Sequence, residues 1–291
     1  MRSGKNRKTV LITGAGAGIG REMARLFYRA GYFLLAVSLV KEELESLESE
    51  LDFIGEGNNS EFLSMDLARP GAAGEVFAWC DSRGYNVDVL INNAGFGLMG
   101  EVVELPSERL TQMLYLNIMT VTELSRLFGG TMKKRGSGHI LNVASTISFQ
   151  PLPYLAMYSA TKAYVSYFTQ SLAAELRPCG VIVSCLYPGT TRTAFLDTAG
   201  IHRPHKGITA GTMIHAAAMD PVKVARAAFK GILRGRRRII PGLSNRFHFY
   251  FIHWVPNRLI IFVVRIVLKG LVKKTINDGA AGSYRRETTP G

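Results

Sequence analysis

The sequence predicts an α/β protein whose main domain is a doubly wound parallel sheet with helices on both faces. Three observations support this prediction. Apolar runs of strand length recur between longer amphipathic stretches, as in a parallel sheet with crossover helices. These runs are continuous in Val, Ile and Leu, which is typical of strands buried on both faces. A glycine-rich turn at residues 13–20 joins the first run to the first amphipathic stretch.

Seven strands and six helices are expected in chain order. The strands are residues 9–13, 33–38, 61–65, 87–91, 139–144, 181–186 and 238–240. The helices are residues 19–30, 41–51, 71–83, 107–133, 155–177 and 221–233. Right-handed crossovers bring the carboxyl ends of all the strands to one edge of the sheet, where ligands bind.

The chain is expected to form one Rossmann-like domain over residues 1–246. A basic, apolar helical extension follows at residues 247–276, and residues 277–291 are polar and expected to be disordered. Within the domain, residues 194–220 interrupt the alternation with a long stretch rich in His, Thr, Gly and Met. A loop of that length in a compact domain is usually functional, so a substrate lid is expected there.

Composition places the chain among ordinary globular proteins. Of its 291 residues, 47% are hydrophobic and 20% are charged, which supplies a core and excludes a disordered or low-complexity protein. The three cysteines, Cys80, Cys179 and Cys185, have neither the spacing of metal ligands nor the number of a disulfide scaffold. This pattern indicates a reducing compartment, and we expect a cytoplasmic protein.

The net charge of +13 is unevenly distributed. Between Arg226 and Lys274 there are twelve Lys or Arg residues and no acid, and a smaller basic cluster lies near the N-terminus. The rest of the chain is close to neutral, as in an enzyme that does not bind nucleic acid. The apolar stretch at residues 259–272 is interrupted by Arg265 and Lys269, so it is too short to span a membrane.

The glycine-rich turn is a candidate phosphate site. Small residues there let the backbone approach a pyrophosphate, whose charge the free N–H groups at a helix N-terminus would meet. The strict G-x-G-x-x-G spacing fails, and the pattern that fits is Gly14-x-x-x-Gly18-x-Gly20, with Gly16 and Ile19 also in the turn. A flexible turn without a ligand is the alternative.

The turn after the second strand bears on the choice of cofactor. A dinucleotide site usually places an acid there for a ribose 2′-hydroxyl, or a base for a 2′-phosphate. The sequence from residue 36 to 41 contains no carboxylate, whereas Ser38 and Lys41 could serve a phosphate. We therefore expect NADP in preference to NAD, although Lys41 could equally be a solvated residue at the start of a helix.

Polar side chains that could take part in catalysis gather near the predicted ligand-binding edge of the sheet. Tyr158 and Lys162 are four residues apart and share one face of a helix. Ser145 ends the fifth strand, residues 92–95 (Asn-Asn-Ala-Gly) end the fourth, and Asn117 lies in the helix that follows.

In their order and spacing, these elements resemble those of the short-chain dehydrogenase/reductase family over residues 8–242. The stretch from Tyr158 to Thr190 is especially similar to bacterial reductases near the hydroxysteroid and 3-oxoacyl reductases. The resemblance implies an NAD(P)-dependent oxidoreductase. The residues that carry it are Thr13 to Gly20, Asp66, Leu67, Asn92 to Gly95, Asn117, Ser145, Tyr158, Lys162, Pro188 and Gly189.

The resemblance also implies a role for each catalytic residue. In the reductive direction Tyr158 would donate a proton to the carbonyl oxygen as hydride reaches the carbon. Lys162 would lower the pKa of Tyr158 and bond the nicotinamide ribose. Ser145 would hydrogen-bond the substrate oxygen, and Asn117 would hold a water that connects Lys162 to solvent.

Further residues are assigned to cofactor and substrate. Asp66 resembles the family's adenine-contacting aspartate, and the threonines after Gly189 would touch the nicotinamide amide or a phosphate. The expected cofactor contacts outside the glycine turn are Ser38, Lys41, Asp66, Leu67, Asn93, Ala94, Gly95, Tyr158, Lys162, Pro188, Gly189, Thr190, Thr191 and Thr193. An apolar substrate wall is expected from Phe149, Leu152, Tyr154, Phe195 and Leu196, beside Ser145.

Several of these residues have a structural alternative. Tyr158 could be a surface tyrosine, Ser145 a turn serine and Asn117 a solvent-exposed helix residue. Asp66 could cap a helix, and the threonines could be plain turn residues.

The C-terminal extension interleaves bases with aromatic and aliphatic residues. On a helix, Arg258, Arg265, Lys269 and Lys273 would form one basic stripe beside apolar faces. Such a segment can lie on an anionic membrane surface, which would place the protein on the inner face of a membrane. Packing on its own domain or on a second subunit is the alternative, and a homo-oligomer is expected.

The leading functional hypothesis is NADPH-dependent reduction of a lipophilic ketone or 3-oxoacyl compound. Two other hypotheses remain open: a non-enzymatic cofactor-binding module that reports redox state, and a membrane-surface scaffold. The complete set of catalytic side chains argues against the binding module, which has no need of them, and liposome flotation would test the scaffold.

Overall fold

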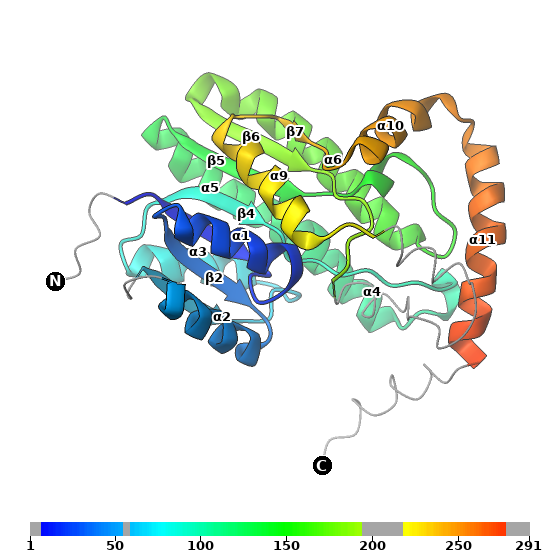
Figure 1. Cartoon of the computed structure of the whole chain (residues 1–291), viewed down its shortest axis with the longest axis horizontal. Helices are drawn as coiled ribbons and strands as arrows, with labels where there is room; N and C mark the ends of the chain where they lie inside the picture. Colours follow the sequence, from blue (N-terminus) through cyan, green and yellow to red (C-terminus); the bar gives the residue numbers. More distant parts are fainter. Residues whose placement is uncertain (1–6, 55–58, 194–217, 278–291) are drawn as a thin grey trace, which may run out of the picture.

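A parallel seven-stranded sheet forms the centre of the computed structural model, which describes residues 7–54, 59–193 and 218–277 (Figure 1). Its strand order is β3-β2-β1-β4-β5-β6-β7, so the chain winds outward from β1 in both directions. The strands are β1 (Thr9–Thr13), β2 (Phe33–Ser38), β3 (Ser60–Ser64), β4 (Val87–Asn92), β5 (Gly138–Val143), β6 (Val181–Leu186) and β7 (Arg238–Ile239). The predicted doubly wound, Rossmann-like fold is confirmed.

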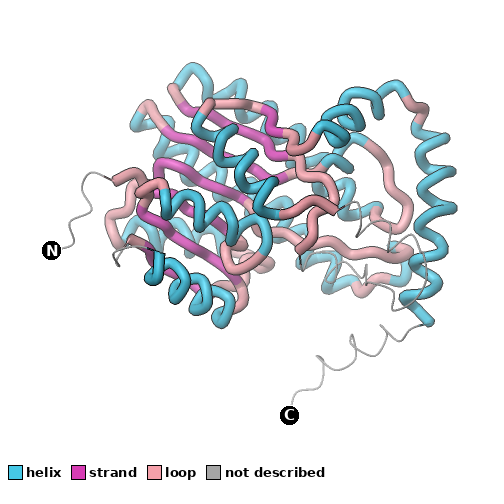
Figure 2. The backbone as a smooth tube through the Cα atoms, in the orientation of Figure 1, coloured by secondary structure: helices cyan, strands magenta, loops and turns pink. Residues whose placement is uncertain are grey.

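Helices cover both faces of the sheet (Figures 1 and 2). One face carries α1 (Gly18–Arg29), α2 (Lys41–Ile54) and α9 (Pro221–Leu233), with Phe27 buried between Tyr32 and Phe229 at centroid distances of 5.0 and 4.9 Å. The other face carries α3 (Ala72–Ser82), α5 (Val121–Arg135) and α6 (Ala156–Leu176). These two apolar layers bury the central strands and fix the edge at which the strands end.

The expected helix at residues 107–133 is wrong as a single α-helix. The structure divides it into α4 (Ser107–Leu114), a π-helical turn η2 (Tyr115–Thr120) and α5. A π turn widens the helix by one residue and often marks a functional site. Here it contains Asn117, whose side chain is completely buried.

A buried polar network joins the centre of the sheet to the helices behind it. The Asn92 amide donates to the Asn142 side-chain oxygen at 2.8 Å, and the Asn142 amide donates to Thr169 on α6 at 3.0 Å. Asn92 also donates to Ser125 on α5. Each bond is geometrically specific, so the network fixes how α6 and the strand ends are placed relative to each other.

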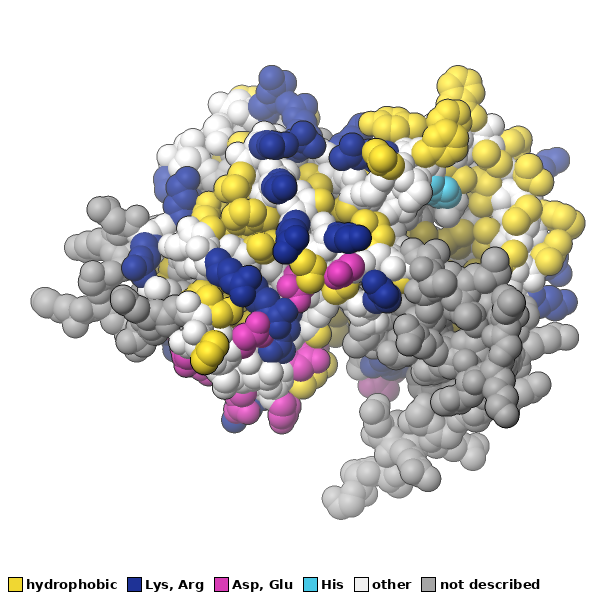
Figure 3. All heavy atoms as spheres, viewed as in Figure 1, with side chains coloured by type: hydrophobic (Ala, Val, Ile, Leu, Met, Phe, Trp, Pro, Cys, Tyr) yellow, Lys and Arg dark blue, Asp and Glu magenta, His cyan; other side chains and the backbone are white. Residues whose placement is uncertain are grey.

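The C-terminal extension is helical, as expected, but it is not one helix. It consists of α10 (Leu243–Phe251), a short turn η5 (Ile252–Trp254) and α11 (Asn257–Asn277), with Pro256 immediately before the second helix. Because α10 begins at Leu243, the expected boundary after residue 246 falls inside a helix. Hydrophobic side chains gather on the surface over this extension (Figure 3). None of the helices in the described part of the chain combines the length and apolarity that crossing a bilayer requires.

Candidate active site

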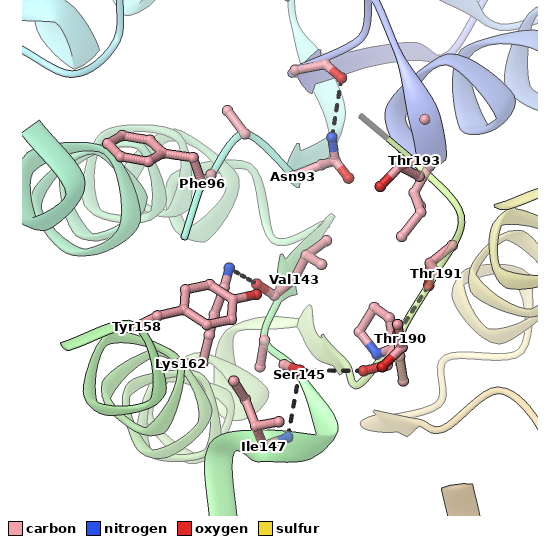
Figure 4. A pocket seen from close by; sticks show the side chains of 18 of the residues that line it. Asn93, Phe96, Val143, Ser145, Ile147, Tyr158, Lys162, Thr190, Thr191 and Thr193 are labelled. Carbon is pink, nitrogen blue, oxygen red and sulfur yellow. Dashed lines mark hydrogen bonds between the residues drawn. The ribbon is translucent and has the colours of Figure 1, made fainter. Parts of the chain in front are cut away.

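A cavity of about 380 Å³ lies at the carboxyl edge of the sheet. Its walls come from the turns after β1, β4, β5 and β6, from α6 and from α11. Figure 4 shows Tyr158 and Lys162 on one side of it, Thr191 and Thr193 on the other, and Ser145 between them, near Thr190. The topology therefore gathers the predicted site residues at the edge where the sequence placed them.

The glycine turn depends on backbone that only small residues tolerate. Gly14 and Gly18 have positive φ angles of 64° and 54°. A Cβ on Gly20 would stand 2.0 Å from the Gly14 carbonyl oxygen. The Asn93 side chain donates to the carbonyl oxygens of Thr13 and Gly14, at 3.0 and 3.1 Å, and so holds the turn against β4.

The turn also meets the requirements of a phosphate site. It leads directly into the N-terminus of α1, whose first-turn N–H groups carry a partial positive charge. Ala17, Gly18 and Ile19 line the cavity, whereas Gly16 and Gly20 support the turn without lining it. The residues present therefore fit the pyrophosphate of a dinucleotide.

The turn after β2 carries an acid that sequence reasoning missed. The carboxylate of Glu43, from the first turn of α2, lies so close to Gly16 that a Cβ there would stand 2.5 Å from its Oε2 atom. The Ser38 hydroxyl lies beside the same glycine, and both Ser38 and Glu43 line the cavity. In the sequence, Glu43 is visible only as an acid five residues after the end of β2. Its approach to Gly16 could not be predicted, because it depends on how α2 packs.

Three residues assigned to the cofactor outside the glycine turn do not line this cavity. Lys41 instead pairs with Glu45 on the exposed surface of α2, at 3.3 Å. Asp66 is exposed after β3 and accepts a hydrogen bond from the Ala68 N–H at 2.8 Å, which closes a local turn. Leu67 is buried in the apolar core on the α3 and α5 side of the sheet, and its carbonyl accepts a hydrogen bond from Thr120.

Tyr158 and Lys162 lie side by side on α6 and face the cavity (Figure 4). The Lys162 Nζ atom is 5.8 Å from the centre of the Tyr158 ring and donates to the Val143 carbonyl oxygen at 2.9 Å. Both side chains are buried. The surface alternative for Tyr158 is therefore wrong.

Burial sets the protonation of both groups. It raises the pKa of the Tyr158 phenol above its ordinary value and lowers the pKa of Lys162 from 10.5 to about 8. Desolvation of the phenolate is the cause of the raised Tyr158 pKa, and the expected lowering of that pKa by Lys162 stays a prediction. A lysine with a pKa near 8 gives up and regains a proton close to neutral pH.

Ser145 follows β5 and lines the cavity. Its hydroxyl donates to the Pro188 carbonyl at 3.4 Å and accepts from the Ile147 N–H at 3.4 Å. With Ser148 it forms a capping box for the short helix η3 (Thr146–Phe149). The turn role and the site role therefore coexist in one residue, and the long bonds leave the hydroxyl free to reorient toward a ligand.

Asn117 joins the π turn to the catalytic helix. Its amide donates to the Phe96 carbonyl at 2.9 Å and to the Thr161 hydroxyl at 3.1 Å, while its oxygen accepts from the Phe96 N–H at 3.2 Å. A Cβ on Gly95 would meet the Asn117 oxygen at 2.9 Å and Lys162 Nζ at 3.4 Å. Gly95 thus leaves a gap between Asn117 and Lys162, and the exposed alternative for Asn117 is wrong.

The predicted substrate wall is largely corrected. Phe149 packs edge-on against Phe249 at 4.5 Å and beside Tyr187, and with Leu152 it lines a separate surface hollow. Tyr154 does not line the cavity, and its carbonyl accepts the Gly100 N–H. Phe195 and Leu196 lie outside the described residues, as does most of the expected lid. The apolar lining observed is Phe96, Val143, Ile147, Leu155 and Leu268.

The turn after β6 closes the remaining side of the cavity. Pro188, Gly189, Thr190, Thr191 and Thr193 all line it. The backbone of Thr191 also pairs with Met219, and its hydroxyl donates to the Gly189 carbonyl. Asn93, Ala94 and Gly95 line the cavity as well, and the nicotinamide contacts expected of these residues stay a prediction.

Comparison with known proteins adds independent findings. The family model described as short chain dehydrogenase matches residues 8–203. The probable oxidoreductase EphD of Mycobacterium tuberculosis is 34% identical over 197 residues, which are 67% of this chain. That match covers 33% of EphD, so the chain spans about a third of that relative's length.

Three solved structures share the fold with substantial identity. The bulky-bulky ketone specific alcohol dehydrogenase from Comamonas testosteroni is 30% identical, with a TM-score of 0.70 over 82% of this chain and 87% of that one. A short-chain dehydrogenase from Sphingobium yanoikuyae in complex with NADPH is 31% identical (TM-score 0.73; 82% and 90% covered). A short-chain dehydrogenase/reductase from Burkholderia phymatum in complex with NAD is 25% identical (TM-score 0.74; 85% and 93% covered).

The glycine turn can be tested with two matched substitutions. Gly20→Ala drives a methyl group into the Gly14 carbonyl, so we expect a displaced turn, a lower melting temperature and at least about a tenfold loss of dinucleotide affinity. Gly74→Ala on α3 meets no atom within 4 Å and should leave affinity unchanged. Calorimetric titration and thermal unfolding measure both, and equal affinity of the two variants would contradict the assignment of this turn.

Proposed function

This chain belongs to the short-chain dehydrogenase/reductase family, and we propose that it transfers a hydride between a nicotinamide cofactor and a lipophilic carbonyl compound. Family membership makes it an oxidoreductase of the NAD(P)-binding type, rather than the non-enzymatic module or scaffold considered above. The observation that carries the proposal is the meeting of Ser145, Tyr158 and Lys162 with the glycine turn in one cavity.

The cofactor, when bound, supplies the hydride. In the reductive direction the carbonyl carbon gains that hydride, and the Tyr158 phenol gives its proton to the carbonyl oxygen, which yields the alcohol and a tyrosinate. The Ser145 hydroxyl, which already reaches both Pro188 and Ile147, turns to donate to the same oxygen as charge develops there. The reverse sequence oxidises the alcohol.

Lys162 replaces the proton that Tyr158 has lost. Its pKa of about 8 lets the ammonium return a proton at neutral pH, and its Nζ atom is held near the phenol by the Val143 carbonyl. The gap left by Gly95 connects Nζ to Asn117. We assign Asn117 to a positioning role, in which it keeps a water between Lys162 and solvent.

The lining of the cavity supports a lipophilic substrate. Phe96, Ile147, Leu155 and Leu268 contribute apolar surface to the cavity wall. Lys162 and Glu43 are the charged residues in the described wall; the Lys162 Nζ atom already donates to the Val143 carbonyl oxygen, and Glu43 is itself an acid. A neutral ketone or a 3-oxoacyl compound fits this wall better than a small hydrophilic acid does.

The choice between NADP and NAD depends on Glu43. The sequence favoured NADP because no acid follows β2 directly. The Glu43 carboxylate beside Ser38 and Gly16 weakens that expectation, since it would accept hydrogen bonds from ribose hydroxyls and repel a 2′-phosphate. We propose that NAD binds at least as tightly as NADP and that Glu43 sets this ratio.

The catalytic assignment predicts that Tyr158→Phe retains the cofactor and loses turnover. The substitution removes only the proton donor, so we expect kcat for an apolar ketone to fall by about 10²-fold or more while the Kd for cofactor stays within about threefold. NADH and NADPH oxidation against a panel of ketones, with titration calorimetry, measures both. Tyr167→Phe, on the exposed face of the same helix, is the control and should keep full activity. Full turnover in Tyr158→Phe would overturn the mechanism.

The cofactor assignment predicts that Glu43→Gln shifts binding toward NADP. The amide keeps the size of the side chain and removes its charge, so we expect the ratio of the Kd for NADP to the Kd for NAD to fall about tenfold. The neighbouring Glu42→Gln makes the same change of charge on an exposed residue outside the cavity and should leave the ratio unchanged. If the two variants shift the ratio equally, Glu43 does not select the cofactor.

A further inference from the structure

The C-terminal extension is anchored to the domain by its inner face. Phe249 of α10 is buried against Phe149 and Tyr187, and the Asn245 side chain packs over Gly189. On α11, Ile260 and Leu268 are buried, eight residues apart and therefore on the same side of the helix. The extension thus has a defined orientation, with one face toward the domain and the other away from it.

The outer face of the extension is strongly apolar. Trp254 is 85% exposed and Leu243 is 82% exposed, and α10 adds the stacked pair Phe247 and Phe251. On α11, five apolar side chains are each about half exposed or more: Leu259, Phe262, Val263, Ile266 and Val267. Figure 3 shows hydrophobic side chains gathered over α10 and α11. A patch of this extent on a folded protein marks an interaction site.

Basic side chains border the apolar surface. Arg258, Arg265 and Lys269 are exposed and, at spacings of seven and four residues, lie together along one flank of α11. Arg246 adds a fourth base on α10. The sequence has no acid between Arg226 and Lys274, and the structure describes no ion pair for these four bases. The surface therefore combines exposed aromatic and aliphatic groups with uncompensated positive charge.

We propose that the outer face of α10, η5 and α11 lies in the interface of an anionic lipid bilayer. Aromatic and aliphatic side chains would enter the boundary between headgroups and acyl chains, and the bases would bind lipid phosphates. The charge argues against a second copy of this chain as the occupant, because a two-fold contact would set these bases against each other without an acid from this segment. Nucleic acid fits less well, because the aliphatic residues of α11 would be buried against phosphates.

The same helix also borders the catalytic cavity. Leu268 lines the cavity, while Ile266, two residues before it, is 60% exposed on the outer face. An apolar substrate dissolved in the bilayer would then have a short route into the cavity along α11. This second step rests on the proposed function, whereas docking on the bilayer does not.

Vesicle flotation of the full chain tests the docking. We expect binding to vesicles of phosphatidylcholine with about 30% phosphatidylglycerol and much weaker binding to phosphatidylcholine alone. The triple variant Arg258→Gln, Arg265→Gln, Lys269→Gln should lower the partition coefficient on the anionic vesicles about a hundredfold. Phe262→Ser with Ile266→Ser should lower it about tenfold or more.

A matched control separates this surface from the net charge of the chain. The control is the triple variant Arg234→Gln, Arg236→Gln, Arg237→Gln, which removes the same charge from the exposed turn between α9 and β7. This turn lies at the amino ends of the strands, opposite the cavity, so the variant should bind vesicles nearly as well as the native chain. Unchanged melting temperature and cofactor affinity in all variants show that they fold. Equal binding to neutral and anionic vesicles, or equal losses in the two triple variants, would overturn the proposal, as would a dimer in solution that Phe262→Ser with Ile266→Ser abolishes.

The route along α11 is tested separately by activity. A ketone of long chain length presented in anionic vesicles should be reduced more slowly by the triple variant of α11 than by the native chain, while a water-soluble ketone is reduced at the same rate by both. Equal rates on the vesicle-borne ketone would overturn the route and leave docking to be judged by flotation. If no ketone is reduced by the native chain, the proposed function fails and the flotation result still stands.

Discussion

The buried contact of Tyr158 and Lys162 against the end of β5 is the constraint on which this site depends. Lys162 could not be kept in so dry a place without the Val143 carbonyl that accepts its hydrogen bond, and that carbonyl is available because β5 ends there. The cost of burying an ammonium is visible in its lowered pKa. A protein selected for stability alone would place an apolar residue at this position, so the lysine indicates chemistry.

The rest of the sheet edge is arranged around that contact. The Asn92 and Asn142 network ties β4 and β5 to α6, and the Asn93 side chain ties β4 to the glycine turn. The glycine turn and Tyr158 are therefore held in a fixed arrangement by hydrogen bonds across three neighbouring strands. The π turn adds Asn117, whose amide donates hydrogen bonds to the Phe96 carbonyl and to the Thr161 hydroxyl on α6.

The sequence was informative where local pattern decides structure, and less so where packing decides it. Strands buried on both faces read directly as apolar runs, and the spacing of Ser145, Tyr158 and Lys162 placed them correctly at one edge. Glu43 was missed because its approach to Gly16 depends on the packing of α2. Phe149 was assigned to the wrong cavity because the η3 turn directs it toward Tyr187 and Phe249. Pro256 was a visible signal that the extension would not be one helix.

Titration of the Tyr158 phenol with and without oxidised cofactor tests the central claim most directly. Tyrosine labelled with ¹³C at the ring carbon bearing the hydroxyl, with Tyr158→Phe to assign the resonance, reports the ionisation of this residue. The account predicts a pKa above the ordinary value of about 10 in the protein alone, because burial opposes the phenolate, and a fall of at least about two units when the positively charged nicotinamide is bound. The same pKa in both states, or an ordinary value in the protein alone, would contradict it.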